Sequence, residues 1–358
     1  MKKKTVVRKT IIPVAKIDGT GVLNDIRKLI ESARGRVATY ANAEITMLYW
    51  KVGERIRREI LQEKRAEYGQ EIVPTLSAQL VQDYGNNFEV KNLWRMMQFA
   101  EYFSKEEIVV TLSRQLSWSH FIEIIPVKDT LAREFYAEMC RMERWSVRTL
   151  RKKIGSLMFE RTAIAKKPET VIKMELASLR EQDKLTPDLV FRDPYFLDIL
   201  GLKGCFQEKD LESAILREME AFILELGTGF SFMARQKRII VGGEDFFLDL
   251  LFYHRDLRRL VAIELKMEKF KPDFKGQMEL YLKWLDKHDR KPGEEHPIGL
   301  ILCAGKSDEQ IELLELSKSG IRVAEYMTEL MPKSLLEKKF HEAIKLARMR
   351  LDYKGKEG

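Results

Sequence analysis

The stretch that decides the fold reads FFLDLLFYHRDLRRLVAIELKMEKFKPDFKGQMELY and runs from Phe246 to Tyr281. It contains two short apolar runs, Phe246–His254 and Leu260–Met267. Both have aromatic or β-branched residues, which predicts a strand in each. The short polar segment 254–259 between them predicts the turn of an antiparallel hairpin. Such a hairpin would bring charged side chains of the two runs close to one another.

The expected turn also fixes which charged residues meet. A loop centred on residues 256–257 sets the register, because antiparallel partners then sum to a constant. This register places Asp249 opposite Glu264, and Lys266 follows on the face of Glu264, one pleat further on. Two carboxylates and one ammonium group therefore converge in otherwise apolar strands. Burying each ion without a partner costs on the order of several kcal/mol, which a hard divalent cation would relieve.

The chemistry that fits these three residues is metal-assisted hydrolysis at a phosphate. Mg²⁺ (or Mn²⁺) is bound by one or two carboxylates together with waters and phosphate oxygens, which makes Asp249 and Glu264 candidate ligands. Lys266 would hold or deprotonate an attacking water, or neutralise charge on the phosphoryl group. The alternative is a salt-bridged hairpin in which Lys266 pairs with one of the acids and has no chemical role.

The same residues resemble a known motif. Asp249 followed by Glu264-Leu265-Lys266 is similar to the D…(D/E)-x-K core of the PD-(D/E)XK nuclease superfamily, and Gln277 to Tyr281 is similar to the Q-x3-Y motif of its RecB-like branches. The longer string over residues 227–286 resembles the YhcG-type PD-(D/E)XK nuclease family, bacterial proteins with a helical amino half. The similarity runs from about residue 30 to about residue 326. One departure is Leu248, where the superfamily has proline before the aspartate; this position supplies no metal ligand.

The resemblance implies a fold, an activity and further site residues. The expected fold is an α-helical amino-terminal domain followed by an α/β restriction-endonuclease-like domain, with a central mixed sheet flanked by helices. The Leu265 carbonyl would be a third metal ligand. A glutamate from the first helix of the nuclease domain would be a further metal ligand, and Glu212 is preferred over Glu225 for this role. Gln277 and Tyr281, which share one helix face, would help to place Lys266 or the scissile phosphate.

Two regions of the chain carry candidate contacts to DNA. In the segment 72–103, a helix, a Gly-Asn-Asn turn and a second helix outline a helix-turn-helix, and a plain helical hairpin is the alternative. Its second helix would present four side chains that suit phosphates or base edges. The four residues of this helix are Lys91, Asn92, Arg95 and Gln98. In the segment before the hairpin, Arg235 and Gln236 would contact substrate phosphate.

Charge is unevenly distributed along the 358 residues. Residues 1–170 hold 31 Lys and Arg against 21 Asp and Glu, whereas the remaining 188 hold 32 against 34. The net charge of +8 therefore lies in the amino half. Basic surface is typical of proteins with a polyanionic partner, although a solvated surface without a partner has the same composition.

The pattern of elements and breaks predicts four segments. They are a basic flexible tail (1–20), a helical domain that binds DNA or a protein partner (21–165), a linker (166–186) and the nuclease domain (187–358). No apolar run approaches the roughly 20 residues of a membrane span. Three scattered cysteines form neither a zinc motif nor a disulfide framework, which favours a reducing cytoplasm. His120, in the run SWSHF, is interpreted as a structural residue.

The sequence therefore predicts a divalent-metal-dependent deoxyribonuclease that acts in DNA recombination, repair or defence against foreign DNA. DNA is the expected partner, with a protein partner for the amino-terminal domain and a homo-oligomer as further possibilities. Two alternatives stay open. One is a nucleic-acid-binding module that keeps the nuclease fold without catalysis, and the other is a subunit of a larger defence or recombination complex.

Overall fold

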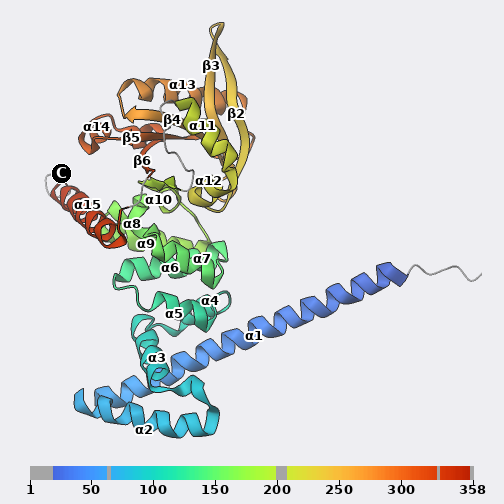
Figure 1. The fold of residues 1–358 in the computed structure, drawn as a ribbon, viewed down its shortest axis with the longest axis vertical. Helices are drawn as coiled ribbons and strands as arrows, with labels where there is room; N and C mark the ends of the chain where they lie inside the picture. The colour runs from blue at the N-terminus through green and yellow to red at the C-terminus, as the bar shows by residue number, and fades with distance from the viewer. Residues whose placement is uncertain (1–18, 63–65, 199–207, 329–330, 355–358) are drawn as a thin grey trace, which may run out of the picture. The chain divides into compact units, whose positions relative to one another are not determined.

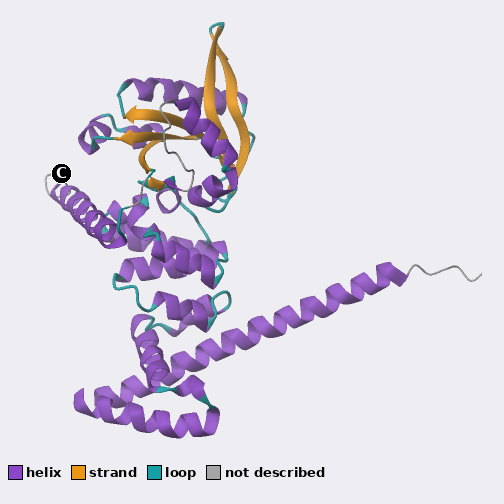
Figure 2. Ribbon diagram, in the orientation of Figure 1, coloured by secondary structure: helices purple, strands orange, loops and turns teal. Residues whose placement is uncertain are grey.

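The computed structural model describes residues 19–62, 66–198, 208–328 and 331–354. The chain divides into two compact units, which we call unit 1 (residues 1–118) and unit 2 (residues 119–358). Figure 1 shows their elements in chain order, and Figure 2 shows that the sheet lies wholly in unit 2. The predicted basic tail lies almost entirely outside the described residues. Its last two positions, Gly19 and Thr20, already belong to a helix.

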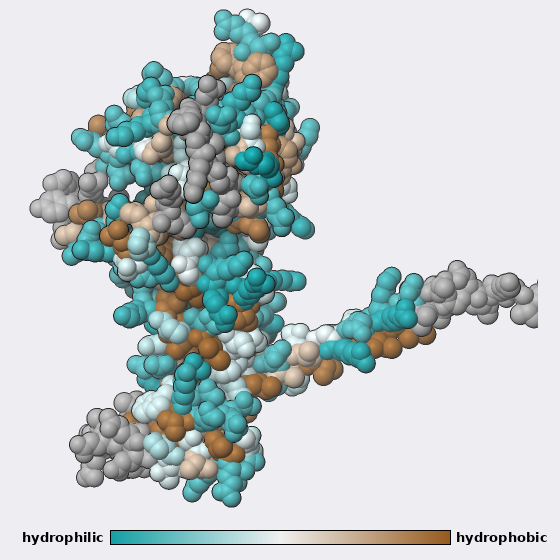
Figure 3. Space-filling model, viewed as in Figure 1, coloured by the Kyte–Doolittle hydropathy of each residue, from teal (hydrophilic) through white to brown (hydrophobic). Residues whose placement is uncertain are grey.

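Unit 1 is entirely helical where the structure describes it. The long first helix packs on the third through a core of six buried residues, Tyr49, Ile56, Val73, Leu93, Met96 and Met97. Trp118 packs against the same core. Hydrophobic side chains also gather along one side of the amino-terminal part of the first helix (Figure 3). The elements are α1 (Gly19–Gln62), α2 (Ala66–Tyr84), η1 (Asn86–Phe88), α3 (Val90–Tyr102) and α4 (Glu106–Ser113).

Gly53 lies where α1 approaches α3 most closely. A Cβ atom at this position would stand 1.9 Å from the carbonyl oxygen of Met96. We expect Gly53→Ala to destabilise unit 1 by about 1–3 kcal/mol, because the two helices must move apart. Gly35→Ala, in the same helix with no atom of the described chain within 4 Å of the added carbon, is the control. Urea denaturation of both variants measures the difference, and equal midpoints would contradict this packing.

Unit 2 begins with a layer of short helices. Asp129 and Ser146 accept hydrogen bonds from the first-turn amides of two of them, the usual role of N-cap residues. The residue pattern over 146–161 predicts one helix, but Leu157 has a φ of 54° and separates two helices. The elements are α5 (Trp118–Ile124), α6 (Thr130–Glu143), α7 (Val147–Gly155), α8 (Met158–Arg161), η2 (Ala163–Lys166), α9 (Glu169–Gln182) and α10 (Pro187–Val190).

Some of these helices lie in the segment that the sequence assigned to a linker. Helix α9 packs on α6, and its Ile172, Leu176 and Leu179 are buried. Residues 119–190 therefore share one compact unit with the sheet, although the functional division at 166–186 stays a prediction. Residues 189–200 read from the sequence as a strand or an extended lead; in the structure α10 ends at Val190, a two-residue strand forms at Tyr195–Phe196, and residues 199–200 lie outside the described residues.

The sheet of unit 2 has six strands in the order β1-β6-β5-β4-β3-β2. The pairs β2–β3 and β3–β4 are antiparallel, whereas the pairs β4–β5, β5–β6 and β6–β1 are parallel. The expected mixed sheet is thus confirmed. The strands are β1 (Tyr195–Phe196), β2 (Phe230–Val241), β3 (Glu244–His254), β4 (Arg259–Lys269), β5 (Ile298–Gly305) and β6 (Ile321–Met327).

Helices pack against this sheet on its two sides (Figure 1). Helix α13 covers an apolar core that includes Leu248, Ala262 and Tyr281, while α11 packs on β4 and α12 on β2. The residue pattern over 208–226 predicts one helix, but Glu218 leaves the helical conformation and divides it in two. The helices are α11 (Glu208–Arg217), α12 (Met219–Leu226), α13 (Asp273–His288), α14 (Asp308–Leu313), η4 (Leu316–Ser319) and α15 (Lys333–Lys354).

No helix in the part of the chain that the structure describes combines the length and apolar composition of a membrane span.

Candidate active site

The hairpin of β3 and β4 forms as predicted, with a four-residue loop between His254 and Arg259. Its ladder ends at the pair Leu250 and Ile263, and the same register continued by one residue places Asp249 opposite Glu264. Beyond this pair, the side-chain carboxylates of the two acids accept hydrogen bonds from backbone amides of the opposite strand, in place of backbone carbonyls. The Asp249 amide donates to Glu264 Oε1 at 3.2 Å, and the Leu265 amide donates to Asp249 Oδ2 at 2.9 Å. The two acids are therefore held where the strands part.

Glu264 is buried, with 3% of its surface exposed, and its charge is costly at this position. Burial, and then the neighbouring Asp249 carboxylate, raise the pKa of Glu264 to about 8, although Lys266 acts in the opposite direction. The Lys266 ammonium lies 3.2 Å from Glu264 Oε2 and 3.9 Å from Glu208 Oε2. Burial lowers the pKa of Lys266, but these carboxylates outweigh it and raise the value. Lys266 therefore carries a positive charge at neutral pH.

Glu212 faces the same place from helix α11. The Gln236 amide group of β2 donates to Glu212 Oε2 at 3.1 Å and to Asp249 Oδ1 at 3.0 Å, so it bridges the two acids. Glu212 is buried, and its Oε1 has no hydrogen-bond partner within the described chain. Arg235 approaches that oxygen to 3.6 Å. A cavity of about 600 Å³ opens here, lined by Glu208, Lys209, Glu212, Arg235, Gln236 and Asp249.

Gln277 and Tyr281 lie on one face of α13, as their spacing predicted. The Gln277 amide donates to the Tyr281 hydroxyl at 2.7 Å, and this hydroxyl donates to the Phe247 carbonyl at 3.3 Å. The Tyr281 ring is buried, and this burial raises the pKa of its hydroxyl, while the hydrogen bond from Gln277 acts in the opposite direction. This pair therefore braces β3 two residues before Asp249, and the structure shows no direct bond from it to Lys266.

The donor set of this site fits a hard divalent cation. Asp249 and Glu264 lie close together, and the pKa of Glu264 is raised. A buried oxygen of Glu212 has no hydrogen-bond partner in the described chain. A bound cation would offset the repulsion between the carboxylates, favour the charged form of Glu264 and give the Glu212 oxygen a partner. Across the described residues, no three acidic, histidine or cysteine side chains are already gathered closely enough to hold a metal. Gln236 lies between Glu212 and Asp249 instead. The role of the Leu265 carbonyl as a ligand stays a prediction.

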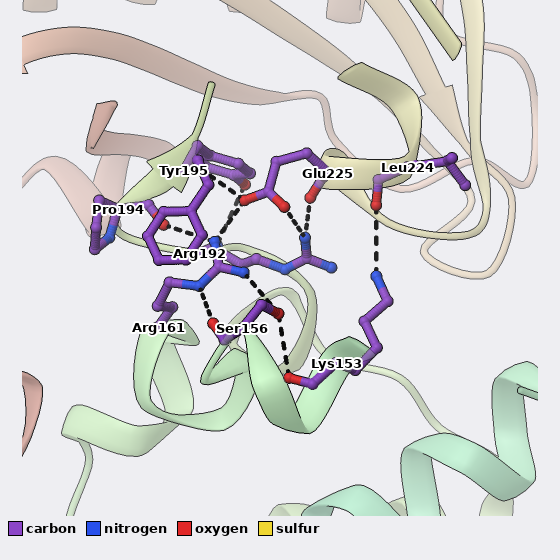
Figure 4. A network of polar contacts seen from close by, with 9 residues as sticks. Lys153, Ser156, Arg161, Arg192, Pro194, Tyr195, Leu224 and Glu225 are labelled. Carbon is purple, nitrogen blue, oxygen red and sulfur yellow. Dashed lines mark hydrogen bonds and ion pairs between the residues drawn. The ribbon is translucent and has the colours of Figure 1, made fainter. Parts of the chain in front are cut away.

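Glu225, the alternative acid of the sequence analysis, belongs to a different cluster (Figure 4). Its carboxylate accepts hydrogen bonds from Arg161 Nη1 of α8 and, at 2.8 Å, from the Phe196 amide of β1. Arg192 Nη1 lies 3.5 Å from the other carboxylate oxygen and also donates to the Glu225 carbonyl. Both arginine side chains are 1% exposed. We call these three residues the Glu225 cluster; it joins α12 to the helical layer.

The Glu225 cluster has more buried positive than negative charge. Burial raises the pKa of Glu225, but Arg161 and Arg192 outweigh it and hold the value below its ordinary range. Among the described residues, Arg192 Nε has no hydrogen-bond partner. Nearby Lys153 donates to the Leu224 carbonyl, and burial followed by the charge of Arg192 lowers its pKa to about 7. Sequence reasoning missed this cluster, because its residues are 30 to 70 positions apart.

The predicted DNA contacts occur in both units. Lys91 and Gln98 are exposed and Asn92 and Arg95 half-buried on α3, where Arg95 donates to Asn92 at 3.4 Å. The pair α2 and α3, joined through η1, keeps the predicted outline, while its use as a helix-turn-helix stays a prediction. His120 Nε2 lies 3.0 Å from the Trp145 carbonyl. This hydrogen bond supports the structural interpretation of His120.

Two features of the site were missed from the sequence. Glu208 was read only as the first residue of a helix, but it lies close to Lys266. Gln236 was expected to meet phosphate, yet it bonds to two acids and adopts a positive φ of 42° within a strand. A four-residue spacing from Glu208 to Glu212 was the available signal, because such residues share one face of a helix.

Comparison with known proteins confirms the expected resemblance and fold class. A family model for the DUF1016 N-terminal domain matches residues 25–161, and one for the YhcG PDDEXK nuclease domain matches residues 188–342. The chain is 33% identical over 308 residues to the putative nuclease YhcG of Escherichia coli (strain K12). That match covers 78% of this chain and 81% of the relative.

Solved structures show weaker likeness. A repair endonuclease from Pyrococcus abyssi is 24% identical with a TM-score of 0.25, and a complex of EndoMS with double-stranded DNA is 20% identical with a TM-score of 0.27. Each match covers 36% of this chain and about half of the other chain, 50% and 48% respectively. The two family matches and the bacterial relative together show that this chain belongs to the YhcG family, with a DUF1016 N-terminal domain followed by a YhcG PDDEXK nuclease domain.

Proposed function

We propose that this protein is a divalent-metal-dependent deoxyribonuclease, with Mg²⁺ or Mn²⁺ as its cofactor. The observation that carries the proposal is the convergence of Asp249, Glu264 and Lys266 where β3 and β4 part, beside the cavity that Glu212 lines. The matching nuclease-domain family and the name of the bacterial relative support the same activity. Its setting would be DNA recombination, repair or defence in a bacterial cytoplasm.

Each residue has a role that follows from its surroundings. Asp249, Glu264 and Glu212 would hold the cation, which when bound supplies Lewis acidity and a nucleophilic water. Lys266 keeps its proton, so it suits charge neutralisation at the phosphoryl group and orientation of a water better than removal of a proton. The Gln277 and Tyr281 pair fixes the strand that carries Asp249.

The surroundings of the site suit a nucleic-acid backbone. Arg235 is largely exposed at the cavity, with 60% of its side chain accessible, and it can reach a phosphate there. In unit 1, the face of α3 with Lys91, Arg95 and Gln98 would bind DNA, and the basic amino half would strengthen that attraction electrostatically. A protein partner for this domain remains a second use of the same surface.

The decisive experiment incubates the full chain with a panel of labelled DNAs. Duplex, single-stranded, flap and four-way junction substrates are each supplied with Mg²⁺, with Mn²⁺, or with EDTA. We expect cleavage of at least one DNA with either metal and none with EDTA, because the acids need a cation to approach a phosphodiester. Equal cleavage in EDTA, or none of any substrate with either metal, would refute the proposal.

A second candidate is a DNA-binding module without catalysis. It is favoured by the contact between Lys266 and Glu264 at 3.2 Å, which gives the ammonium group a partner without any metal. Calorimetry with Mn²⁺ separates the two candidates. A nuclease of this design binds the ion with measurable heat, whereas the binding module binds DNA but gives no heat with the metal.

A further inference from the structure

Helix α1 has two parts that differ in what covers them. From Thr46 onward its residues pack in unit 1: Thr46, Tyr49 and Trp50 are buried, and the Trp50 indole donates to the Phe103 carbonyl at 2.7 Å. Before residue 43, every residue whose burial is described is exposed. Its large apolar side chains are between 45% and 70% accessible, namely Ile26, Leu29, Ile30, Val37 and Tyr40. This apolar stripe is visible along one side of the helix in Figure 3.

The spacing of the stripe is that of a coiled coil. Ile26, Ile30, Ala33, Val37 and Tyr40 follow one another at alternating intervals of four and three residues. This repeat of 3.5 residues keeps one seam of a helix facing a partner helix along its whole length. Before residue 43 the described residues of the helix are exposed, so this part gains little from packing on its unit, and an isolated helix is marginal in water. The stripe therefore needs a helical partner.

The residues of the seam and its flanks indicate the partner's type. In the heptad notation abcdefg, the β-branched Ile30 and Val37 occupy a, while Ile26, Ala33 and Tyr40 occupy d. β-branched residues at a are compatible with a two-stranded coiled coil, and the flanking charges decide the orientation. In a parallel dimer, each flanking g residue faces the e residue of the next heptad, so Leu29 meets Arg34 and Arg36 meets Ala41, without any like-charged pair. In an antiparallel dimer the e positions of the two helices face each other, so Arg27 of each copy would lie opposite Arg34 of the other. These two like-charged pairs disfavour the antiparallel arrangement.

We propose that residues 19–42 of α1 form a parallel coiled coil with a second copy of this chain. The seam from Ile26 to Tyr40 rises about 21 Å at 1.5 Å per residue, which spans two heptads. The seam ends where Glu44 takes the next a position and α1 turns its apolar side to α3. The dimer supplies two nuclease domains in one particle. This surface is separate from the candidate active site, so it does not depend on the proposed function.

The first test measures mass in solution. The full chain, at tens of micromolar in light scattering or sedimentation equilibrium, should have the mass of two chains. Ile30→Glu combined with Val37→Glu places four carboxylates in the dimer seam and should give the mass of one chain. The matched control is Ser32→Glu with Thr39→Glu, which adds the same charges at the same spacing on the outer face and should leave the dimer intact.

The second test fixes the orientation without adding charge. In a parallel dimer the two copies of Val37 face each other, so Val37→Cys should form an interchain disulfide under mild oxidation. Thr39→Cys should not, and the unaltered chain measures any background from its own three cysteines. A single-chain mass for the unaltered protein would overturn the proposal. So would an unchanged dimer in the Ile30→Glu, Val37→Glu variant, or equal cross-linking at 37 and 39.

Discussion

Replacing Lys266 with alanine should remove metal-dependent DNA cleavage and leave the protein folded. The ammonium group is the one cation that Glu264 touches at the point where the described strands β3 and β4 part, and it would face the phosphoryl group there. Loss of a single group that stabilises transition-state charge costs about 100- to 1,000-fold in rate. The pKa of Glu264 is about 8 even with Lys266 beside it, so Glu264 is already largely a neutral acid at pH 7, and removing Lys266 leaves no uncompensated buried charge. Steady-state cleavage of the best substrate measures the loss.

Two further variants make this result specific. Asp249→Ala removes both the carboxylate and its bond to the Leu265 amide, and it should abolish cleavage and lower the affinity for Mn²⁺. Lys271→Ala removes an exposed lysine that pairs with Glu268 just beyond the end of β4, and it should cleave as the unaltered chain does. Circular dichroism confirms that each variant is folded. Retained cleavage in both Lys266→Ala and Asp249→Ala would show that the chemistry lies elsewhere.

Local pattern was enough to predict the hairpin and the three residues at its end. The two apolar runs allow one register once the turn is placed, and a slip by one residue would turn every apolar side chain to the wrong face. Asp249, Glu264 and Lys266 are therefore positioned by short-range rules. The helix with Gln277 and Tyr281 follows from its own periodicity in the same way. For these residues, sequence spacing and spatial contact are nearly the same thing.

The residues that were missed depend on contacts between distant segments. Gln236 bonds to Glu212 and Asp249 because β2 and α11 are brought together by the whole sheet, which no local pattern shows. The breaks at Leu157 and Glu218 were also missed. Neither residue is a glycine or a proline, so the sequence gives no break signal at either position, and tertiary packing decides. The sequence placed Glu212 and Glu225 on one helix and preferred Glu212 as the ligand, and the fold puts the two acids in different surroundings.

The fold gives these two acids opposite functions, which a pair of substitutions can test. Glu225 neutralises two arginines that are each 1% exposed, whereas Glu212 lines the open cavity of the site. Glu225→Ala should lower the free energy of unfolding by about 3–5 kcal/mol, because it leaves two guanidinium groups buried without their counter-ion. Glu212→Ala removes a buried carboxylate whose Oε1 has no hydrogen bond in the described chain, so it should cost far less stability.

Metal affinity should follow the opposite order. Glu212→Ala is expected to weaken Mn²⁺ binding about tenfold or more, because one charged ligand near Asp249 is lost. Glu225→Gln, which keeps a hydrogen-bond acceptor for Arg161 and removes the charge, should bind Mn²⁺ as the unaltered chain does while still unfolding at lower urea. Urea denaturation and Mn²⁺ calorimetry on the same preparations give both quantities. If Glu225→Gln lost metal affinity at full stability, Glu225 would be the ligand and the Glu225 cluster would not be structural.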